Sequence, residues 1–223
     1  MKSVIAIDGP AGAGKSTIAR KLAKKLNYRY LDTGAMYRAV TWYALKTGAD
    51  ILDENKMTRL AKDINISFKT NKNNGKTHIY VNENDVSDKI RKRKIDNNVS
   101  EIAKISGVRK EMVKIQQKIA KDGRIIVDGR DIASRVLPDA DLKIYLTASV
   151  EERARRRHNE LLDKGEESDL NKIKNEIKKR DYIDKNREHS PLTKTEDAIL
   201  IDTTNLSKKK VLDKIMQLIR KGD

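Results

Sequence analysis

The sequence predicts an α/β protein with a central parallel sheet, helices on both of its faces, and a small β-rich insert. Short β-branched runs alternate with amphipathic stretches along the chain, and this alternation indicates a parallel sheet. Residues 64–86 interrupt it with the two-residue period of a hairpin. The length of 223 residues fits one large domain, or one domain carrying a lobe.

Five short apolar runs have the character of buried strands in a parallel sheet. They lie at residues 4–7, 28–31, 124–127, 142–146 and 198–201. Apolar residues at three- and four-residue spacing predict helices at residues 15–26, 34–46 and 208–219, with two more after the insert. Two charged helices, residues 151–162 and 170–184, flank a break at Gly165. In the insert, alternating residues surround a turn signal at Asn73-Asn74-Gly75.

Composition excludes several kinds of site. The chain has no cysteine, which rules out disulfides, thiolate zinc sites and cysteine nucleophiles. The three histidines are far apart and form no ligand pattern. No stretch approaches the 18 apolar residues of a membrane span, and the first residues lack the features of a signal peptide. We therefore expect a cytoplasmic protein without a membrane partner.

The formal net charge of +16 has two interpretations. An electropositive surface could attract nucleic acid or phosphate-rich ligands. Alternatively, a lysine-rich composition simply covers solvated helix faces, which the diffuse distribution of the charge favours. Aromatic residues make up only 4% of the chain, which is poor material for stacking nucleic-acid bases.

A phosphate-binding loop follows the first predicted strand. Gly9-Pro10-Ala11-Gly12-Ala13-Gly14-Lys15-Ser16 matches the pattern G-x4-G-K-[ST] between a strand and an amphipathic helix. Backbone N–H groups and the helix N-terminus would surround phosphate oxygens. The lysine would reach the β- and γ-phosphates, and the serine hydroxyl could bind magnesium. The sequence thus predicts a P-loop NTPase fold.

Other features indicate which class of P-loop protein this is. The chain has no Asn-Lys-x-Asp run of the kind that binds guanine, which argues against a GTPase. It has several isolated arginines in its second half, as a kinase needs to hold two phosphate-bearing substrates. Asp128 ends a predicted strand, where a second carboxylate for magnesium would sit, although it could equally begin a turn before Gly129.

Two arginine groups occupy the charged helices. Arg180, Asp184 and Arg187 share one helix face, as do Arg153, Arg156 and Arg157. On spacing alone, each group could be a solvated surface ladder or part of a phosphate site.

At this point the chain resembles bacterial cytidylate kinases over essentially its whole length. The resemblance rests on the P-loop through Thr17 and on ordered motifs whose combination is specific. These are Leu31-Asp32-Thr33-Gly34-Ala35-Met36-Tyr37-Arg38, Asp128-Gly129-Arg130-Asp131-Ile132, Leu146-Thr147-Ala148-Ser149, Arg153-Ala154-Arg155-Arg156-Arg157, Arg180-Asp181, Pro191-Leu192 and Glu196-Asp197-Ala198.

The resemblance implies a role for each matching residue. Gly9, Pro10, Ala11, Gly12, Ala13, Gly14, Lys15, Ser16 and Thr17 would bind ATP, and Ser16 and Asp128 would hold Mg²⁺. Ser100, Arg109 and Asp131 would read the cytosine edge. Arg38, Arg130 and Arg187 would bind the acceptor phosphate, Arg180 and Asp184 would lie near the ribose, and Thr33 and Tyr37 near the acceptor pocket. Lys15, Arg130, Arg153, Arg157 and Arg187 would assist catalysis.

The resemblance also implies a division of one domain, residues 1–223. The core would comprise residues 1–62, 92–150 and 186–223. An inserted nucleoside-monophosphate-binding lobe with a small β-hairpin would span about 63–91, and a short helical lid carrying Arg153 and Arg157 about 150–185. The chain departs from its relatives at Ala133-Ser134-Arg135, where Gly-Thr-Val is usual. We expect Arg135 to point outward.

The predicted reaction converts ATP and CMP or dCMP into ADP and CDP or dCDP, with magnesium. No general base is required, because the acceptor phosphate is already anionic. We expect a monomer that binds small molecules and no nucleic acid. Two alternatives stay open: a kinase of another acceptor, such as UMP, AMP or shikimate, and a basic nucleic-acid-binding protein that uses its P-loop as a nucleotide switch.

Overall fold

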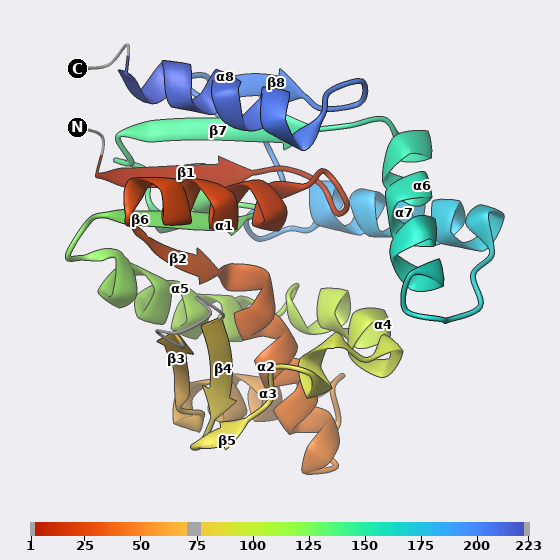
Figure 1. Ribbon diagram of the computed structural model, residues 1–223. Helices are drawn as coiled ribbons and strands as arrows, with labels where there is room; N and C mark the ends of the chain where they lie inside the picture. Colours follow the sequence, from red (N-terminus) through yellow and green to blue (C-terminus); the bar gives the residue numbers. More distant parts are fainter. Residues whose placement is uncertain (1–2, 71–76, 221–223) are drawn as a thin grey trace. The chain divides into compact units, whose positions relative to one another are not determined.

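A computed structural model describes residues 3–70 and 77–220, and its ribbon is drawn in Figure 1. Tertiary contacts divide the chain into two compact units. The first comprises Met1–Asp32 and Ile119–Asp223, and the second Thr33–Lys118. The predicted turn at Asn73-Asn74-Gly75 lies outside the described residues.

The first unit contains a five-stranded sheet in the order β2-β6-β1-β7-β8. All its neighbouring strands are parallel. In that order, the strands are Arg29–Asp32, Ile125–Gly129, Val4–Asp8, Leu142–Thr147 and Ile199–Asp202. β1 lies in the middle of the sheet. The chain adds β2 and β6 on one side of β1 and then β7 and β8 on the other side. Ligands of open α/β sheets bind outside the carboxyl ends of the strands at such a switch point.

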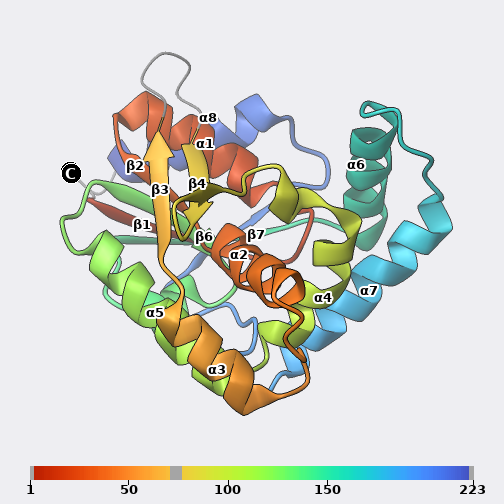
Figure 2. The same ribbon diagram turned by 90° about the horizontal axis from the view of Figure 1, so that it is seen from below.

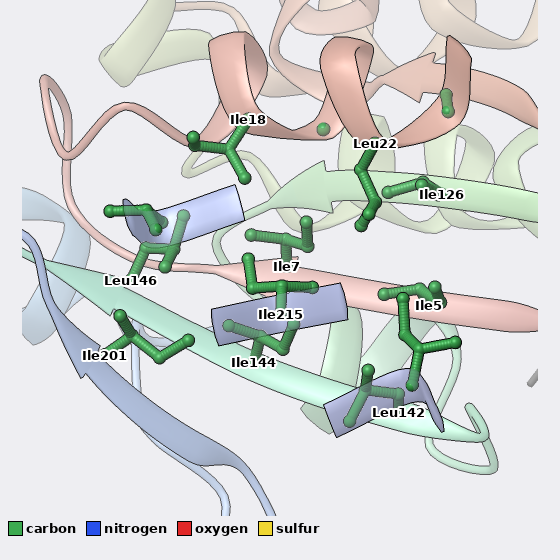
Figure 3. Close-up of a cluster of buried hydrophobic side chains, with 14 of the residues drawn as sticks. Ile5, Ile7, Ile18, Leu22, Ile126, Leu142, Ile144, Leu146, Ile201 and Ile215 are labelled. Carbon is green, nitrogen blue, oxygen red and sulfur yellow. The ribbon is translucent and has the colours of Figure 1, made fainter. Parts of the chain in front are cut away.

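One face of this sheet is covered by α1 (Lys15–Leu26) and α8 (Lys208–Arg220). Every second residue of β1 and β7 points to this face because successive strand side chains alternate. Figure 3 shows Ile5 and Ile7 among side chains from the neighbouring strands and from both helices. Burial of this cluster fixes α1 on the sheet, and with it the loop that precedes α1.

Helical segments follow the carboxyl ends of β6 and β7. A π-helical turn, η2 (Ile132–Val136), comes after β6, and α6 (Val150–Leu162) after β7. α6 lies beside α7 (Leu170–Asn186), as Figures 1 and 2 show. Gly165 lies between them with φ +73°, a left-handed conformation that glycine adopts without steric cost. The α/β class, the parallel five-stranded sheet and the surrounding helices confirm the predicted fold.

The second unit combines helices with a small antiparallel sheet. Its helices are α2 (Thr33–Lys46), α3 (Glu54–Asp63), the 3₁₀ turn η1 (Lys89–Arg91), α4 (Arg93–Ile102) and α5 (Ser106–Ala120), which runs two residues past the boundary. β3 (Ile66–Thr70) pairs antiparallel with β4 (Thr77–Val81), as Figure 2 shows, and β5 (Asn84–Asp85) pairs with β4. The predicted hairpin is present, with β5 as an additional short strand.

The unit boundaries differ from those that the sequence predicts. The sequence places only residues of about 63–91 in the inserted lobe. In the structure, α2 contacts α3, β4, η1 and α4, so the hairpin and four helices cluster together. The helices α2, α3 and α4, which the predicted division assigned to the core, therefore belong to the same compact unit as the hairpin. Within residues 3–70 and 77–220, no helix is long and apolar enough to cross a membrane.

We expect Leu22→Ala to lower the free energy of unfolding by about 2–5 kcal/mol, because truncation of a buried leucine leaves a cavity. Leu22 is 0% exposed within the cluster of Figure 3. Urea unfolding followed by circular dichroism measures the change. Leu52→Ala is the matched control, because Leu52 is 77% exposed, and it should change stability by less than about 0.5 kcal/mol. Equal losses in both variants would contradict the assignment of this core.

Candidate active site

The P-loop connects β1 to α1 and lies close to β7. Gly9 has φ +144°, and a Cβ atom there would come 1.9 Å from the backbone oxygen of Leu146. No other residue type fits without displacing the β7 backbone. Gly14, at the N-cap of α1, is left-handed with φ +92°. These two glycines give the loop its turn and leave the N-terminus of α1 directed into it.

Lys15 begins α1 and is buried. Its Nζ donates to the backbone oxygen of Pro10 at 2.8 Å, so the side chain lies back along its own loop. Burial, together with the nearby Arg130 guanidinium, lowers the pKa of Lys15 below its usual range. The ammonium has lost water and has gained only part of the negative charge that would compensate it. An anion at this loop would supply the rest.

Asp128 lies in β6, beside β1, and is also buried. Its Oδ2 accepts from the Ser16 hydroxyl at 2.8 Å, and its Oδ1 accepts from the Tyr30 hydroxyl at 2.8 Å. Burial and the neighbouring Asp32 raise the pKa of Asp128, although Lys15 and these two hydrogen bonds oppose the shift. A carboxylate and a hydroxyl held together offer the hard oxygen ligands that Mg²⁺ prefers. The two side chains therefore fit a magnesium ion.

Arg153 joins α6 to both α7 and the P-loop. Its guanidinium makes a bidentate ion pair with Asp181 of α7, at 3.0 and 2.6 Å. It also donates to the backbone oxygens of Ala148 at 2.9 Å and Ala11 at 3.1 Å. A Cβ atom at Gly12 would lie 3.0 Å from the Cβ of Arg153. Because the Arg153 side chain is only 4% exposed, it does not belong to a solvated helix face.

Arg156 and Arg157, the other arginines of this group on α6, are also held by protein groups. Arg156 donates to Glu152 at 2.8 Å and to the backbone oxygen of Thr203 at 2.7 Å. The Thr203 hydroxyl in turn lies 3.3 Å from the backbone oxygen of Ala13 in the P-loop. Arg157 pairs with Glu160 at 3.0 Å and is 35% exposed. Arg156 thus links α6 to the P-loop region, whereas Arg157 is the more accessible cation.

A second group of charges surrounds Asp184 near the end of α7. Arg130 donates from Nε to Asp184 at 2.7 Å, and Arg187 lies 4.0 Å from Asp184 and 3.9 Å from Asp131. Burial alone would raise the pKa of Asp184, but Arg130, Arg180 and Arg187 lower it below its usual range. The structure therefore brings together five predicted acceptor residues, and the burial of Asp184 and Arg187 excludes a solvated ladder for these two.

Asp8, at the carboxyl end of β1, is a buried carboxylate that the sequence motifs do not single out. Its two oxygens accept from the backbone N–H groups of Ile132 at 2.9 Å and Ala133 at 2.8 Å. Burial raises the pKa of Asp8 to about 6, although these two hydrogen bonds oppose the shift. Asp8 thus ties the strand before the P-loop to the loop that follows β6.

The remaining predicted residues belong to the second unit. The Arg109 guanidinium lies 5.4 Å from the centroid of the Tyr37 ring and donates to the backbone oxygen of Ala103 at 3.1 Å. Arg38 of α2 forms an ion pair with Asp96 of α4. Thr33 begins α2, and Ser100 lies on α4. Arg109 and Tyr37 are thus neighbours.

Sequence reasoning missed Asp8, Tyr30 and Asp181 as supports of the site. One signal was available for Asp8, since it ends a buried strand as Asp128 does. Tyr30 and Asp181 act through partners 98 and 28 residues away, which no local pattern reveals. The expectation for Arg135 agrees with the structure, where its side chain is exposed at the surface of η2.

Comparison with known proteins places the chain in a family. Residues 5–221 match the family model described as cytidylate kinase. A cytidylate kinase of Bacillus cereus (strain B4264) is 50% identical over 215 residues, covering 96% of this chain and 95% of the relative. A cytidylate kinase of Bacillus thuringiensis (strain Al Hakam) is 49% identical with the same coverage.

Solved structures show a similar fold at low sequence identity. A shikimate kinase from Bacteroides thetaiotaomicron aligns with a TM-score of 0.51 and 9% identity, covering 99% of each chain. A gluconokinase from Sinorhizobium meliloti 1021 aligns with a TM-score of 0.51 and 10% identity, covering 97% of this chain and 90% of the other. At these identities, the likeness concerns the fold alone.

We expect Asp181→Ala to lower the free energy of unfolding by about 3–5 kcal/mol, because it leaves the buried Arg153 guanidinium without its carboxylate. Chemical unfolding measures the loss. Glu160→Ala is the matched control, because Glu160 is likewise a carboxylate in ion pairs, with Arg157 and Lys164, but its side chain is 52% exposed. Its removal should cost no more than about 1 kcal/mol. Similar costs for both variants would show that the Arg153 pair does not hold α6 and α7 together.

Proposed function

The chain belongs to the cytidylate kinase family, and from this premise we propose that it transfers the γ-phosphoryl group of ATP to CMP or dCMP, giving ADP and CDP or dCDP. The observation that carries the proposal is the full-length family match, together with a P-loop whose lysine is buried. Phosphorylation of CMP by ATP is the activity that the family name states. Use of dCMP is the finer part of the proposal.

On the donor side, the P-loop backbone and the N-terminus of α1 would surround the phosphates. Lys15, held by the Pro10 oxygen at 2.8 Å, would exchange this carbonyl for the β- and γ-phosphate oxygens. The exchange is favourable because a buried ammonium gains more from an anion than from a neutral carbonyl. This contact would offset the charge that the γ-phosphoryl group carries during transfer.

Magnesium would be held by the Ser16 hydroxyl and by Asp128, whose oxygens lie 2.8 Å apart, and it would neutralise phosphate charge when bound. Tyr30 orients Asp128 through the hydrogen bond to its other oxygen. Because that hydrogen bond uses Oδ1, the carboxylate presents Oδ2 to Ser16 in a fixed direction.

On the acceptor side, Arg130, Arg187 and Arg38 would bind the phosphate of the nucleoside monophosphate, and Arg180 and Asp184 the ribose. Asp184 already positions Arg130 through its 2.7 Å ion pair. The acceptor phosphate is anionic near neutral pH and can attack without a general base. The enzyme therefore contributes orientation and charge neutralisation, the two effects that dominate phosphoryl transfer.

The cytosine ring offers an amino donor at N4 and acceptors at N3 and O2. We propose that the Asp131 carboxylate accepts from N4, while Arg109 and Ser100 donate to the ring acceptors, with Thr33 and Tyr37 beside them. Uracil carries an oxygen in place of N4 and would face the Asp131 carboxylate with two acceptors opposed. The buried position of Asp131 supports the proposal, since an unsatisfied buried polar group is costly.

Several further properties belong to the same proposal. α6 and α7 would act as a lid that closes when both substrates neutralise Arg153 and Arg157, with Gly165 as its hinge. The enzyme would work as a cytoplasmic monomer without nucleic acid. Family membership favours a kinase over a basic nucleic-acid-binding protein that uses its P-loop as a switch.

A substrate panel with Lys15→Ala tests the proposed activity. Coupled ADP-release assays should give turnover with CMP and dCMP well above that with UMP, AMP and shikimate. Lys15→Ala should lower kcat at least about 100-fold, because it removes a charge aimed at the transferred group. Lys24→Ala, an exposed lysine on the same helix, is the control and should retain normal turnover. Near-normal activity of folded Lys15→Ala would refute the mechanism, and preference for another acceptor would refute the substrate.

Asp131→Asn tests base recognition. The amide should lower kcat/KM for CMP relative to UMP by about 5- to 150-fold, the range equivalent to one unsatisfied buried polar group. An asparagine amide can donate to the O4 atom of uracil, so part of the change should be a gain with UMP. Steady-state kinetics with both nucleotides at saturating ATP measure the ratio. Equal losses for CMP and UMP would show that Asp131 does not read the base.

A further inference from the structure

Asp8 has an unusual position for a carboxylate. It lies at the carboxyl end of β1, directly before Gly9 of the P-loop, and is 2% exposed. Its Oδ1 accepts from the backbone N–H of Ile132 at 2.9 Å, and its Oδ2 from that of Ala133 at 2.8 Å. Both oxygens of one carboxylate are therefore used by two consecutive amides, 124 and 125 residues away in sequence.

These two amides begin the π-helical turn η2, whose N-cap residue is Asp131. The first N–H groups of a helical turn have no partner within the turn, and an aspartate at the N-cap usually accepts from them. Asp131 makes no such side-chain cap hydrogen bond. Asp8 supplies the cap from a different strand, so the carboxylate of Asp131 is not committed to its own turn.

The backbone of Asp131 is fixed from the other side as well. Its carbonyl oxygen accepts from the N–H groups of Arg135 at 2.9 Å and Val136 at 3.2 Å. Together with the two hydrogen bonds to Asp8, these contacts hold the carbonyl of Asp131 and the two residues that follow it. Asp8 and the hydrogen bonds within the turn thus restrain the backbone from which this side chain leaves the loop.

Only a carboxylate meets the demand of this position. Each of the two amides donates to a separate oxygen here, and an aspartate side chain provides both oxygens, whereas an asparagine has one acceptor oxygen and an NH₂ donor. An asparagine at position 8 would aim its NH₂ group at one of the two backbone N–H groups. The main cost of the carboxylate is its burial, to which the nearby negative charge of Asp131 adds, and the two backbone hydrogen bonds oppose both effects.

We propose that Asp8 is a positioning residue for pyrimidine recognition, which caps η2 so that the Asp131 carboxylate is directed at the base of the acceptor. The inference rests on the proposed role of Asp131 in reading cytosine. Because Asp8 immediately precedes the P-loop, it also connects the strand that presents the donor loop to the loop that selects the acceptor. Asp8 itself contacts neither substrate in this assignment.

Asp8→Asn tests the proposal, with Asp141→Asn as a matched control. Asp141 also accepts two consecutive backbone amides, those of Ser3 and Val4, before the opposite end of β1, but both donate to its Oδ2 at 2.8 Å. Asp8→Asn should lower the ratio of kcat/KM for CMP to that for UMP by about tenfold, on the scale of one hydrogen bond to a charged group. Asp141→Asn should leave this ratio unchanged. Steady-state kinetics at saturating ATP provide both values.

Amide hydrogen exchange gives a second readout that a general loss of stability does not mimic. Asp8→Asn should accelerate exchange at Ile132 and Ala133, whereas Asp141→Asn, whose remaining amide oxygen can still accept from Ser3 and Val4, should leave exchange at Ile132 and Ala133 unchanged. In the unmodified protein, CMP should protect the amides of Ile132 and Ala133 more than UMP does, which tests the inference even if Asp8→Asn fails to fold. Equal protection by CMP and UMP would overturn it.

The outcomes separate this inference from the proposed function. If Asp131→Asn changes the CMP/UMP ratio and folded Asp8→Asn does not, the role of Asp8 is refuted while base reading by Asp131 stands. If neither substitution changes the ratio, both assignments fall. A fall in the ratio for both variants, with faster exchange at Ile132 and Ala133 in Asp8→Asn, supports the positioning role.

Discussion

Three ionisable side chains are buried where β1 and β6 end and α1 begins: Asp8, Asp128 and Lys15. Each is stabilised by a few directed contacts: the Pro10 carbonyl, two hydroxyl groups, or two backbone amides. Burial weakens the charged form of all three, as their pKa shifts show. The apolar packing of α1 and α8 on the sheet holds in place the strands and the helix that carry these groups.

This arrangement explains why the site is built from strand ends. A strand fixed on both sides by parallel neighbours allows little movement of its last residue, so a carboxylate placed there has a defined direction. Asp128 uses this rigidity for its contacts with Ser16 and Tyr30, and Asp8 uses it for a backbone contact. α6 and α7 add charged side chains from a different layer, and Arg153 contacts both Asp181 of α7 and the P-loop carbonyl of Ala11.

The sequence predicted the parts of the molecule that depend on local patterns. The strands, the P-loop helix and the hairpin follow from periodicity and glycine spacing, and the structure agrees within a few residues. The sequence did not predict contacts between distant residues. No local pattern near Asp181 indicates a partner in α6, and none near Tyr30 indicates Asp128. The clustering of α2 to α5 with the hairpin also depends on tertiary contacts, which hydrophobic spacing does not encode. Most site residues came from resemblance, because arginines on a helix face look the same on a solvated surface.

The contact between Gly12 and Arg153 has an evolutionary consequence. Gly12 is left-handed with φ +77°, and its missing side chain leaves the space that the stem of Arg153 occupies. A side chain at position 12 would be strained at this φ and would crowd the stem of Arg153, whose guanidinium holds Asp181 of α7. Substitutions at these three positions should therefore be coupled. Lineages that diverge here should do so by concerted replacement of the set, and single exchanges between relatives should be harmful.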